Sequence, residues 1–429
     1  MDLEAKRLRF IRDTEIENTV RAYSTQLFLA AGLNPQAVDV YLIDDPSLNA
    51  FVAGGQNMFL HTGLLLRAET PLQVMGVIAH ETGHITGGHI VSRGEEVQKT
   101  TAALIASYVL GLGTAIATGR GDAGAAIISG GQGAAVASLL AYTRGQEASA
   151  DQAAIKLLEA TGHSPRGLLE FFEILGDQEA LLSSRQDPYL RTHPLTQDRI
   201  ASLRAAVANS RYADAPAPTN LVAMHERMRA KLFGYLTPER ALRKYGDNND
   251  VSLPGRYARA IAYHERGETQ AALEEVDSLI EEMPDDPYFH ELKGDILFQS
   301  GRVAEAKPEY ERAVEILPDA PLIRRALAHV QMEMNQPEMD KAALEHLKFV
   351  TQREPRNVTG WRLLAGVQGR LGDKGMSTLS QAEAALAMNN PRDAKGFAKR
   401  ALELLPEYSP GWLRAQDIEG LADRLRKRS

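Results

Sequence analysis

The sequence predicts a mainly α protein with one small β-sheet, in which a mixed α+β domain is followed by an α-α superhelical solenoid. Three observations lead to this fold class. Strand-like segments occur only between residues 38 and 62, the rest of the first half favours helix, and after about residue 250 the chain repeats every 34 residues. The predicted domains are residues 1–212 and 251–429, with a linker and connecting helices over 213–250.

The composition excludes several classes of protein and site. With 48 basic and 56 acidic side chains the net charge is −8, so we expect no nucleic-acid partner. The chain has no cysteine, which excludes disulfides, cysteine nucleophiles and thiolate metal sites. A metal site would therefore use His, Asp or Glu. Residues 1–20 lack the apolar core of a signal peptide, which leaves either a cytoplasmic protein or a mature chain whose signal has been removed.

Two short apolar segments bounded by turn residues predict strands at Val38–Ile43 and Ala50–Thr62, the second folded back at Gly54–Gly55. Extended peptides commonly pair with the edge strand of a sheet. We predict that the segment 57–61 is such an edge and binds substrate, through Asn57, Met58, Phe59, Leu60 and His61.

Residues 100–142 contain two weakly polar runs around a short charged turn. The first, residues 100–118, is 19 residues long and uncharged. Both runs are rich in small residues, which disfavours membrane insertion. The alternatives are a transmembrane hairpin and a soluble helical hairpin that packs on the domain or lies on a membrane surface. The second is preferred, with peripheral membrane contact through 100–142.

The C-terminal half repeats itself in register: Ala272 and Ala306 are 34 residues apart, as are Pro284 and Pro318. This pattern resembles the tetratricopeptide repeat, a helical hairpin. About four copies are expected, with a half repeat at 361–372 and a final capping helix. Such solenoids hold peptides or partner proteins on a concave surface. Residues 251–350 carry a net charge of −9, which indicates either a solvated helix surface or an acidic pocket for a basic or extended partner.

The segment 71–90 predicts a helix that carries His80-Glu81-Thr82-Gly83-His84, the H-E-x-x-H motif of zinc proteases. His80 and His84 lie one turn apart on one helix face, so both imidazoles can reach one metal ion. Glu81 is offset around the helix and can act as a base without binding the metal. Gly83 would let another segment approach closely.

A catalytic zinc site needs a third protein ligand, and Glu147 is the best candidate. It precedes an apolar helix that runs to about residue 159. Asp151 lies one turn later on the same face, where it could accept a hydrogen bond from a ligand histidine. The alternative is an exposed acidic pair. His89 falls off the ligand face and is expected to be structural or exposed.

An H-E-x-x-H motif, a hydrophobic hairpin and then E-x-x-x-D resemble peptidase family M48, as do His193-Pro194 and the later Arg199. With the repeats, the whole chain resembles the β-barrel assembly-enhancing branch, found in the periplasm of Gram-negative bacteria. The resemblance implies a zincin-like metallopeptidase domain with one zinc ion per chain. It implies these roles: zinc ligands His80, His84 and Glu147, general base or acid Glu81, supporting residues Asp151 and Arg199, and His193 closing the fourth zinc position.

We therefore expect a zinc-dependent endopeptidase, periplasmic by resemblance, that cleaves unfolded or stalled outer-membrane proteins. Its repeats would dock onto the β-barrel assembly machinery. One alternative is a chaperone or scaffold with latent or minor proteolysis, and another is a cytoplasmic peptidase. For His193 two roles stay open: a plug that holds the zinc site closed, or a hydrogen-bond donor to the oxyanion of the substrate.

Overall fold

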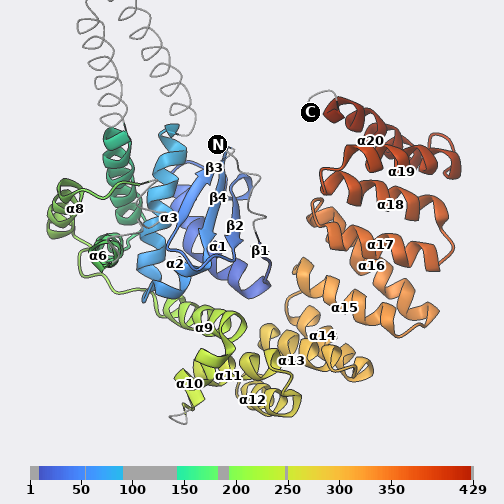
Figure 1. The fold of residues 1–429 in the computed structure, drawn as a ribbon, viewed down its shortest axis with the longest axis horizontal. Helices are drawn as coiled ribbons and strands as arrows, with labels where there is room; N and C mark the ends of the chain where they lie inside the picture. Colours follow the sequence, from blue (N-terminus) through green and yellow to red (C-terminus); the bar gives the residue numbers. More distant parts are fainter. Residues whose placement is uncertain (1–8, 54, 90–142, 182–192, 247–249, 427–429) are drawn as a thin grey trace, which may run out of the picture. The chain divides into compact units, whose positions relative to one another are not determined.

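The computed structural model describes residues 9–53, 55–89, 143–181, 193–246 and 250–426. The chain divides into two compact units, Met1–Leu232 and Phe233–Ser429. The first unit contains one small sheet and several helices, and the described part of the second is helical (Figure 1). The predicted fold class is confirmed, whereas the domain limits at 212 and 251 stay a prediction.

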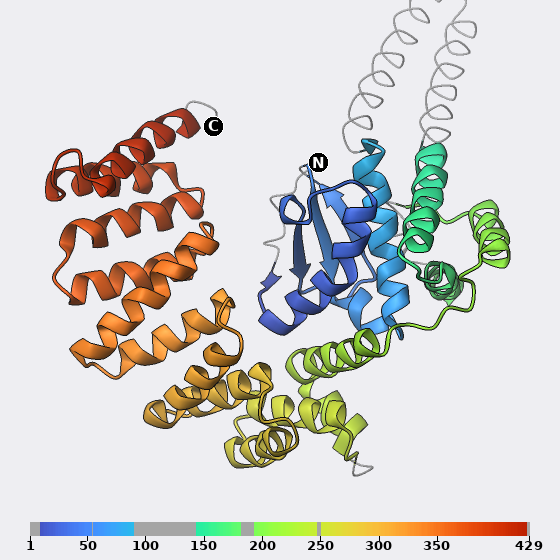
Figure 2. The same cartoon turned by 180° about the vertical axis from the view of Figure 1, so that it is seen from behind.

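The sheet of the first unit has four strands in the order β1-β2-β4-β3. They are β1 (Phe10–Ile11), β2 (Asp39–Ile43), β3 (Ala50–Ala53) and β4 (Asn57–His61). The helices are α1 (Thr14–Ala30), η1 (Pro35–Ala37), α2 (Thr62–Arg67), α3 (Pro71–Thr86), residues 143–160, α6 (Arg166–Leu181), α8 (Gln197–Asn209) and α9 (Thr219–Leu236). Helix α3 lies between the sheet and α6 and packs against α1, β3 and α6 (Figures 1 and 2).

Strand β4 is not an edge strand, so that part of the prediction is wrong. It pairs in parallel with β2 and antiparallel with β3, which occupies its backbone on both sides. Met58 and Leu60 are completely buried and belong to the core, while Phe59 is half-buried. Strand β2, which precedes β3 in the chain, pairs beside β4, and β3 therefore lies at one edge of the sheet with β1 at the other.

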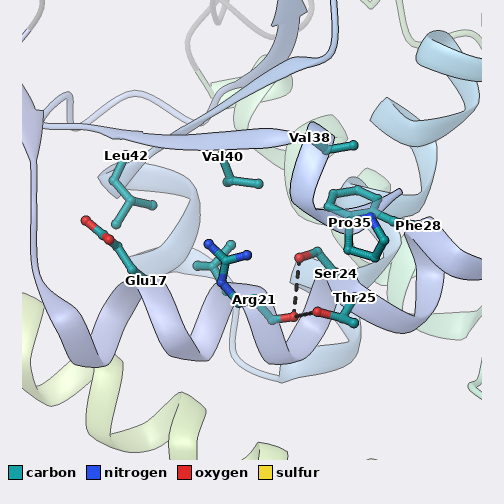
Figure 3. A pocket seen from close by; sticks show the side chains of 10 residues that line it. Glu17, Arg21, Ser24, Thr25, Phe28, Pro35, Val38, Val40 and Leu42 are labelled. Atoms are coloured by element: carbon teal, nitrogen blue, oxygen red, sulfur yellow. Dashed lines mark hydrogen bonds between the residues drawn. The ribbon is translucent and has the colours of Figure 1, made fainter. Parts of the chain in front are cut away.

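Helix α1 packs against β2. Its first turn is capped by the side chain of Asp13, which accepts a hydrogen bond from the backbone of Ile16. A cavity of about 40 Å³ remains between the two elements (Figure 3). Ligand pockets start at about 300 Å³, so this cavity is too small to be a substrate site. Its lining residues are Glu17, Val20, Arg21, Ser24, Thr25, Phe28, Pro35, Val38, Val40 and Leu42.

The first part of α9 is held on the first unit by buried polar contacts. The ring of His225 lies with Nδ1 3.0 Å from the hydroxyl of Tyr23 and Nε2 2.9 Å from the carbonyl oxygen of Ala68. Lys231 Nζ lies 2.7 Å from Asp13, and the buried Glu15 forms an ion pair at 2.9 Å with the half-buried Arg227, one helical turn before Lys231. These contacts explain why the first unit extends to Leu232.

The second unit stacks helix pairs in chain order, as a repeat solenoid requires. The helices are α10 (Pro238–Gly246), α11 (Leu253–Glu265), α12 (Thr269–Glu282), α13 (Pro287–Gln299), α14 (Val303–Ile316), α15 (Pro321–Glu333), α16 (Pro337–Arg353), α17 (Val358–Arg370), α18 (Lys374–Ala387), α19 (Pro391–Leu404) and α20 (Pro410–Arg426). The expected half repeat is wrong: α17 is followed by α18, a full helix of 14 residues, so this copy is complete.

Within the described ranges, no helix combines the length and the apolar character needed to cross a bilayer. The predicted hairpin, with its membrane contact through 100–142, lies outside the described residues.

Candidate metal centre

Helix α3 carries the two histidines of the H-E-x-x-H motif. It begins at Pro71, whose fixed φ suits the first helical position, and its buried run continues through His84. The 3.6-residue period places His80 and His84 on one face, with their Nε2 atoms 3.1 Å apart. Both rings are buried, so the pair is held without solvent around it.

The helix over 143–160 brings Glu147 to this pair. A Cβ added at Gly83 would lie 2.9 Å from the carbonyl oxygen of Ala150, so the two helices approach more closely than a side chain would permit. The result places Glu147 Oε2 3.4 Å from His80 Nε2 and Glu147 Oε1 3.5 Å from His84 Nε2. Glycine in the motif therefore serves the helix contact, as the sequence suggested.

Asp151, one turn after Glu147, lies behind the first histidine. Its Oδ1 is 2.9 Å from His80 Nδ1, the ring nitrogen that points away from His84. Arg199 from α8 donates two hydrogen bonds to this carboxylate, at 2.7 and 2.8 Å. The guanidinium also stacks over Phe172, whose ring meets the edge of His80.

His193 completes the group from the segment before α8. Its Nδ1 is 3.1 Å from Glu147 Oε2 and its Nε2 is 3.5 Å from Glu81 Oε1. Arg199 donates to the carbonyl oxygen of Pro194 at 2.8 Å, which fixes the backbone beside His193. The four donors that lie within 4.8 Å of one another are His80, His84, Glu147 and His193.

The donor set fits a zinc ion. Zn–N and Zn–O bonds of about 2.0–2.2 Å in a tetrahedron set ligand atoms about 3.3–3.6 Å apart. The Nε2 atoms of His80 and His84 are 3.1 Å apart, and they lie 3.4 Å from Oε2 and 3.5 Å from Oε1 of Glu147, respectively. The charges favour a cation, because the buried carboxyl groups of Glu81, Glu147 and Asp151 outnumber the guanidinium of Arg199, and without an ion the site compensates by holding a proton on His80.

The pKa values of the ion-free site follow from burial and close charges. Burial acts against charge on His80, but the carboxylates of Asp151 and Glu147 outweigh it and raise its pKa to about 9. Burial lowers the pKa of His84 to about 3, against the pull of Glu147. Burial would raise the pKa of both carboxyl groups. The histidines around Glu147, and Arg199 with His80 around Asp151, lower them instead, so both are anionic at neutral pH.

Sequence reasoning missed His89. It is half-buried, and its Nδ1 lies 2.9 Å from Nδ1 of His84. The signal was in the sequence: two glycines before it allow a sharp turn at the end of α3. Of the substrate residues predicted on β4, none is among the four donors.

Comparison with known proteins gives matches along most of the chain. Residues 12–207 match the model described as peptidase family M48, and residues 257–321 match the tetratricopeptide repeat. The Beta-barrel assembly-enhancing protease of Yersinia pestis is 26% identical over 399 residues, covering 90% of this chain and 78% of the relative. Its namesake in Escherichia coli K12 is 27% identical over 351 residues, covering 80% and 70%. Metalloprotease LoiP of the same strain is 28% identical over 180 residues, covering 41% and 65%.

Proposed function

We propose that this chain, a metalloprotease that combines a peptidase family M48 domain with tetratricopeptide repeats, is a zinc-dependent endopeptidase that holds one zinc ion on His80, His84 and Glu147. The observation that carries the proposal is the buried cluster of three donor groups: the Nε2 atoms of His80 and His84 are 3.1 Å apart, and the two carboxylate oxygens of Glu147 lie 3.4 and 3.5 Å from them. Each donor group comes from a helix, and Glu81 lies beside the cluster on α3.

Zinc in this site would polarise the scissile carbonyl and lower the pKa of the attacking water. Glu81 takes the proton of that water and passes it to the leaving amine, as a general base and then a general acid. Its carboxylate is buried and 3.5 Å from His193 Nε2. Asp151 orients the ring of His80, and Arg199 holds Asp151.

In this proposal His193 would keep the enzyme latent by adding its ring to the donors that would hold the zinc ion and so excluding the attacking water. Its place among the four donors supports this role. The alternative role, hydrogen bonding to the oxyanion, requires the ring to lie beside the substrate instead of on the metal. The two roles predict opposite effects of replacing it.

An extended substrate would pair with the free edge of β3, which packs against the metal-binding helix α3. The relatives are named for β-barrel assembly, which supports the setting that we propose for this chain. It would be a periplasmic enzyme that acts on unfolded or stalled outer-membrane proteins, with its repeats docking the β-barrel assembly machinery. Tetratricopeptide repeats bind proteins, which supports a docking role.

The alternative function is a chaperone or scaffold whose proteolysis is minor. Glu81→Gln separates the two, because it removes the base while leaving the zinc ligands in place. An endopeptidase should lose cleavage of an unfolded outer-membrane protein while keeping one zinc per chain by elemental analysis. A scaffold should lose nothing, and full activity in this variant would refute the proposal.

A further inference from the structure

We propose that His89 is a positioning residue for the zinc ligand His84, aimed by the Gly87–Gly88 turn at the end of α3. The inference rests on the proposed zinc site and adds a residue to it that neither the H-E-x-x-H motif nor E-x-x-x-D contains. Four features of the described residues carry it: a ring-to-ring contact, a glycine that makes space, a left-handed turn and an anchor to the neighbouring helix.

The contact joins the two Nδ1 atoms, 2.9 Å apart, with the rings nearly perpendicular and their centroids 5.0 Å apart. His84 Nε2 points toward His80 and Glu147, so it is the nitrogen that would bind zinc. A neutral imidazole that binds metal through Nε2 carries its proton on Nδ1. His84 Nδ1 therefore donates, and His89 Nδ1 accepts with the proton of His89 on Nε2.

Gly87 makes space for this arrangement. Its backbone is ordinary right-handed helix, at φ −75° and ψ −6°, so an alanine would be unstrained there. A Cβ at this position would, however, lie 2.4 Å from His89 Nε2 and 2.8 Å from Cε1, well inside contact distance. The absence of a side chain at residue 87 thus allows the ring of His89 to fold back over the helix end.

Gly88 supplies the change of direction. Its φ is +63°, in the left-handed region that glycine adopts without strain. The turn ends α3 and places the ring of His89 against that of His84, five residues earlier. The two glycines therefore have different roles: Gly87 leaves space for the ring of His89, and Gly88 adopts the left-handed backbone conformation of the turn.

The backbone of His89 is also tied to the helix that supplies the third ligand. Gln146 Nε2 donates to the carbonyl oxygen of His89 at 3.4 Å, and Gln146 is buried next to Glu147. His89 consequently connects His84 to the Glu147 helix. The two ligand histidines differ in their partners: His80 faces the carboxylate of Asp151, whereas His84 faces the imidazole of His89.

The test is zinc affinity of the metal-free, full-length chain, measured by competition with a chromophoric chelator. His89→Ala should weaken binding about tenfold to a hundredfold, the usual cost of losing a partner behind a metal ligand. The amide oxygen of asparagine occupies the Nδ1 position of histidine, whereas that of glutamine reaches the Nε2 position. His89→Asn should therefore stay within about threefold of wild type, and His89→Gln should behave like alanine.

Gly87→Ala tests the same contact without touching His89. It should weaken zinc binding in the wild-type background and have no further effect in His89→Ala, because the ring that it displaces is then gone. Gly145→Ala is the matched control, since a Cβ there meets no atom within 4 Å. Hydrogen exchange of α3 in the metal-free variants checks that each one is folded. If His89→Ala does not fold, His89→Asn, His89→Gln and Gly87→Ala decide the question.

The outcomes separate this inference from the function on which it rests. If wild type binds no zinc, or if His84→Ala keeps full affinity, the zinc site itself is wrong and the inference falls with it. If wild type binds one zinc and His84→Ala loses it, but His89→Ala binds as wild type does, only the role of His89 is overturned. The role of His89 would also be overturned if the effects of Gly87→Ala and His89→Ala on zinc affinity were independent, so that the double variant showed the product of the two fold-changes.

Discussion

Arg199 donates two hydrogen bonds to the carboxylate of Asp151, and both side chains are at least 92% buried. The same guanidinium donates to the carbonyl oxygen of Pro194. One residue of α8 therefore sets the position of Asp151, which lies against His80, and of the backbone that carries His193. The ion pair connects both sides of the candidate metal site.

Replacing Arg199 by alanine should destabilise the first unit by about 3–5 kcal/mol, because it leaves the carboxylate of Asp151 buried without its cation. Arg204→Ala is the control on the same helix. Its pair with Glu173 is exposed, so the cost should be below about 1 kcal/mol. Hydrogen exchange of peptides from α3 and α8, measured in the presence of a chelator, gives the loss of stability in both variants. Equal protection in the two variants would contradict the central role of the buried pair.

Glu81→Gln should keep one zinc per chain and lose activity by about a hundredfold to ten-thousandfold, the contribution of a general base. His84→Ala should lose the zinc as well, because it removes one of the three protein ligands. Elemental analysis and cleavage of an unfolded protein substrate test the pair. A His84→Ala protein with full zinc stoichiometry would disprove the ligand assignment.

His193→Ala should raise basal proteolysis or self-cleavage if His193 is a plug. If it only stabilises the oxyanion, turnover should instead fall by about tenfold to a thousandfold. His163→Ala, after the far end of the helix over 143–160, is a control that should change neither rate. The sign of the change relative to this control decides between the two roles.

The stability of the first unit should fall between about pH 6.5 and pH 4 through His225. Burial lowers its pKa to about 4, whereas an unfolded histidine titrates near 6.5. As the pH decreases, the histidine of the unfolded chain binds a proton first. The free energy of unfolding therefore falls by up to about 3 kcal/mol across this window, and it does not change above about pH 6.5 through this residue.

His225→Gln removes that titration and is the comparison. Hydrogen exchange of α1 and α9, measured in the presence of chelator at matched pH values, gives the difference in free energy of unfolding between the two proteins. The titration of all other groups is common to both proteins and cancels in this difference. A difference that does not change from pH 7 to pH 4 would show that His225 is not buried in its neutral form.

Truncation after Leu236 should give a first unit that keeps zinc but captures partner proteins poorly, because it retains α9 and lacks the repeats. Truncation after Tyr212 should be less stable, since it also removes Lys231 and its pairs with Asp13 and Glu15. Zinc content, thermal midpoint and partner capture distinguish the three proteins. Equal capture by the truncated and full-length chains would refute the docking role of the repeats.

Local patterns in the sequence predicted the fold class, the M48 resemblance and the metalloprotease activity, which are confirmed. Glu147 and His193 meet α3 through packing between segments that are distant in the sequence, which local patterns do not determine. That these residues bind zinc stays a proposal. The order of the strands could not be predicted, because the parallel pairing of β2 with β4 joins segments that no local signal connects. The contact of His89 was missed because helical periodicity ends at Gly87, and beyond it only the turn determines direction.

The close approach at Gly83 has a consequence for variation in the H-E-x-x-H motif. In the consensus its two central positions are unrestricted, yet here a Cβ at the second of them, Gly83, would lie 2.9 Å from the carbonyl oxygen of Ala150. A larger residue there would force the helices apart and carry Glu147 away from the histidines, although every chemical group of the motif would be intact. A substitution at this position could therefore abolish metal binding while a motif search still reported an active enzyme.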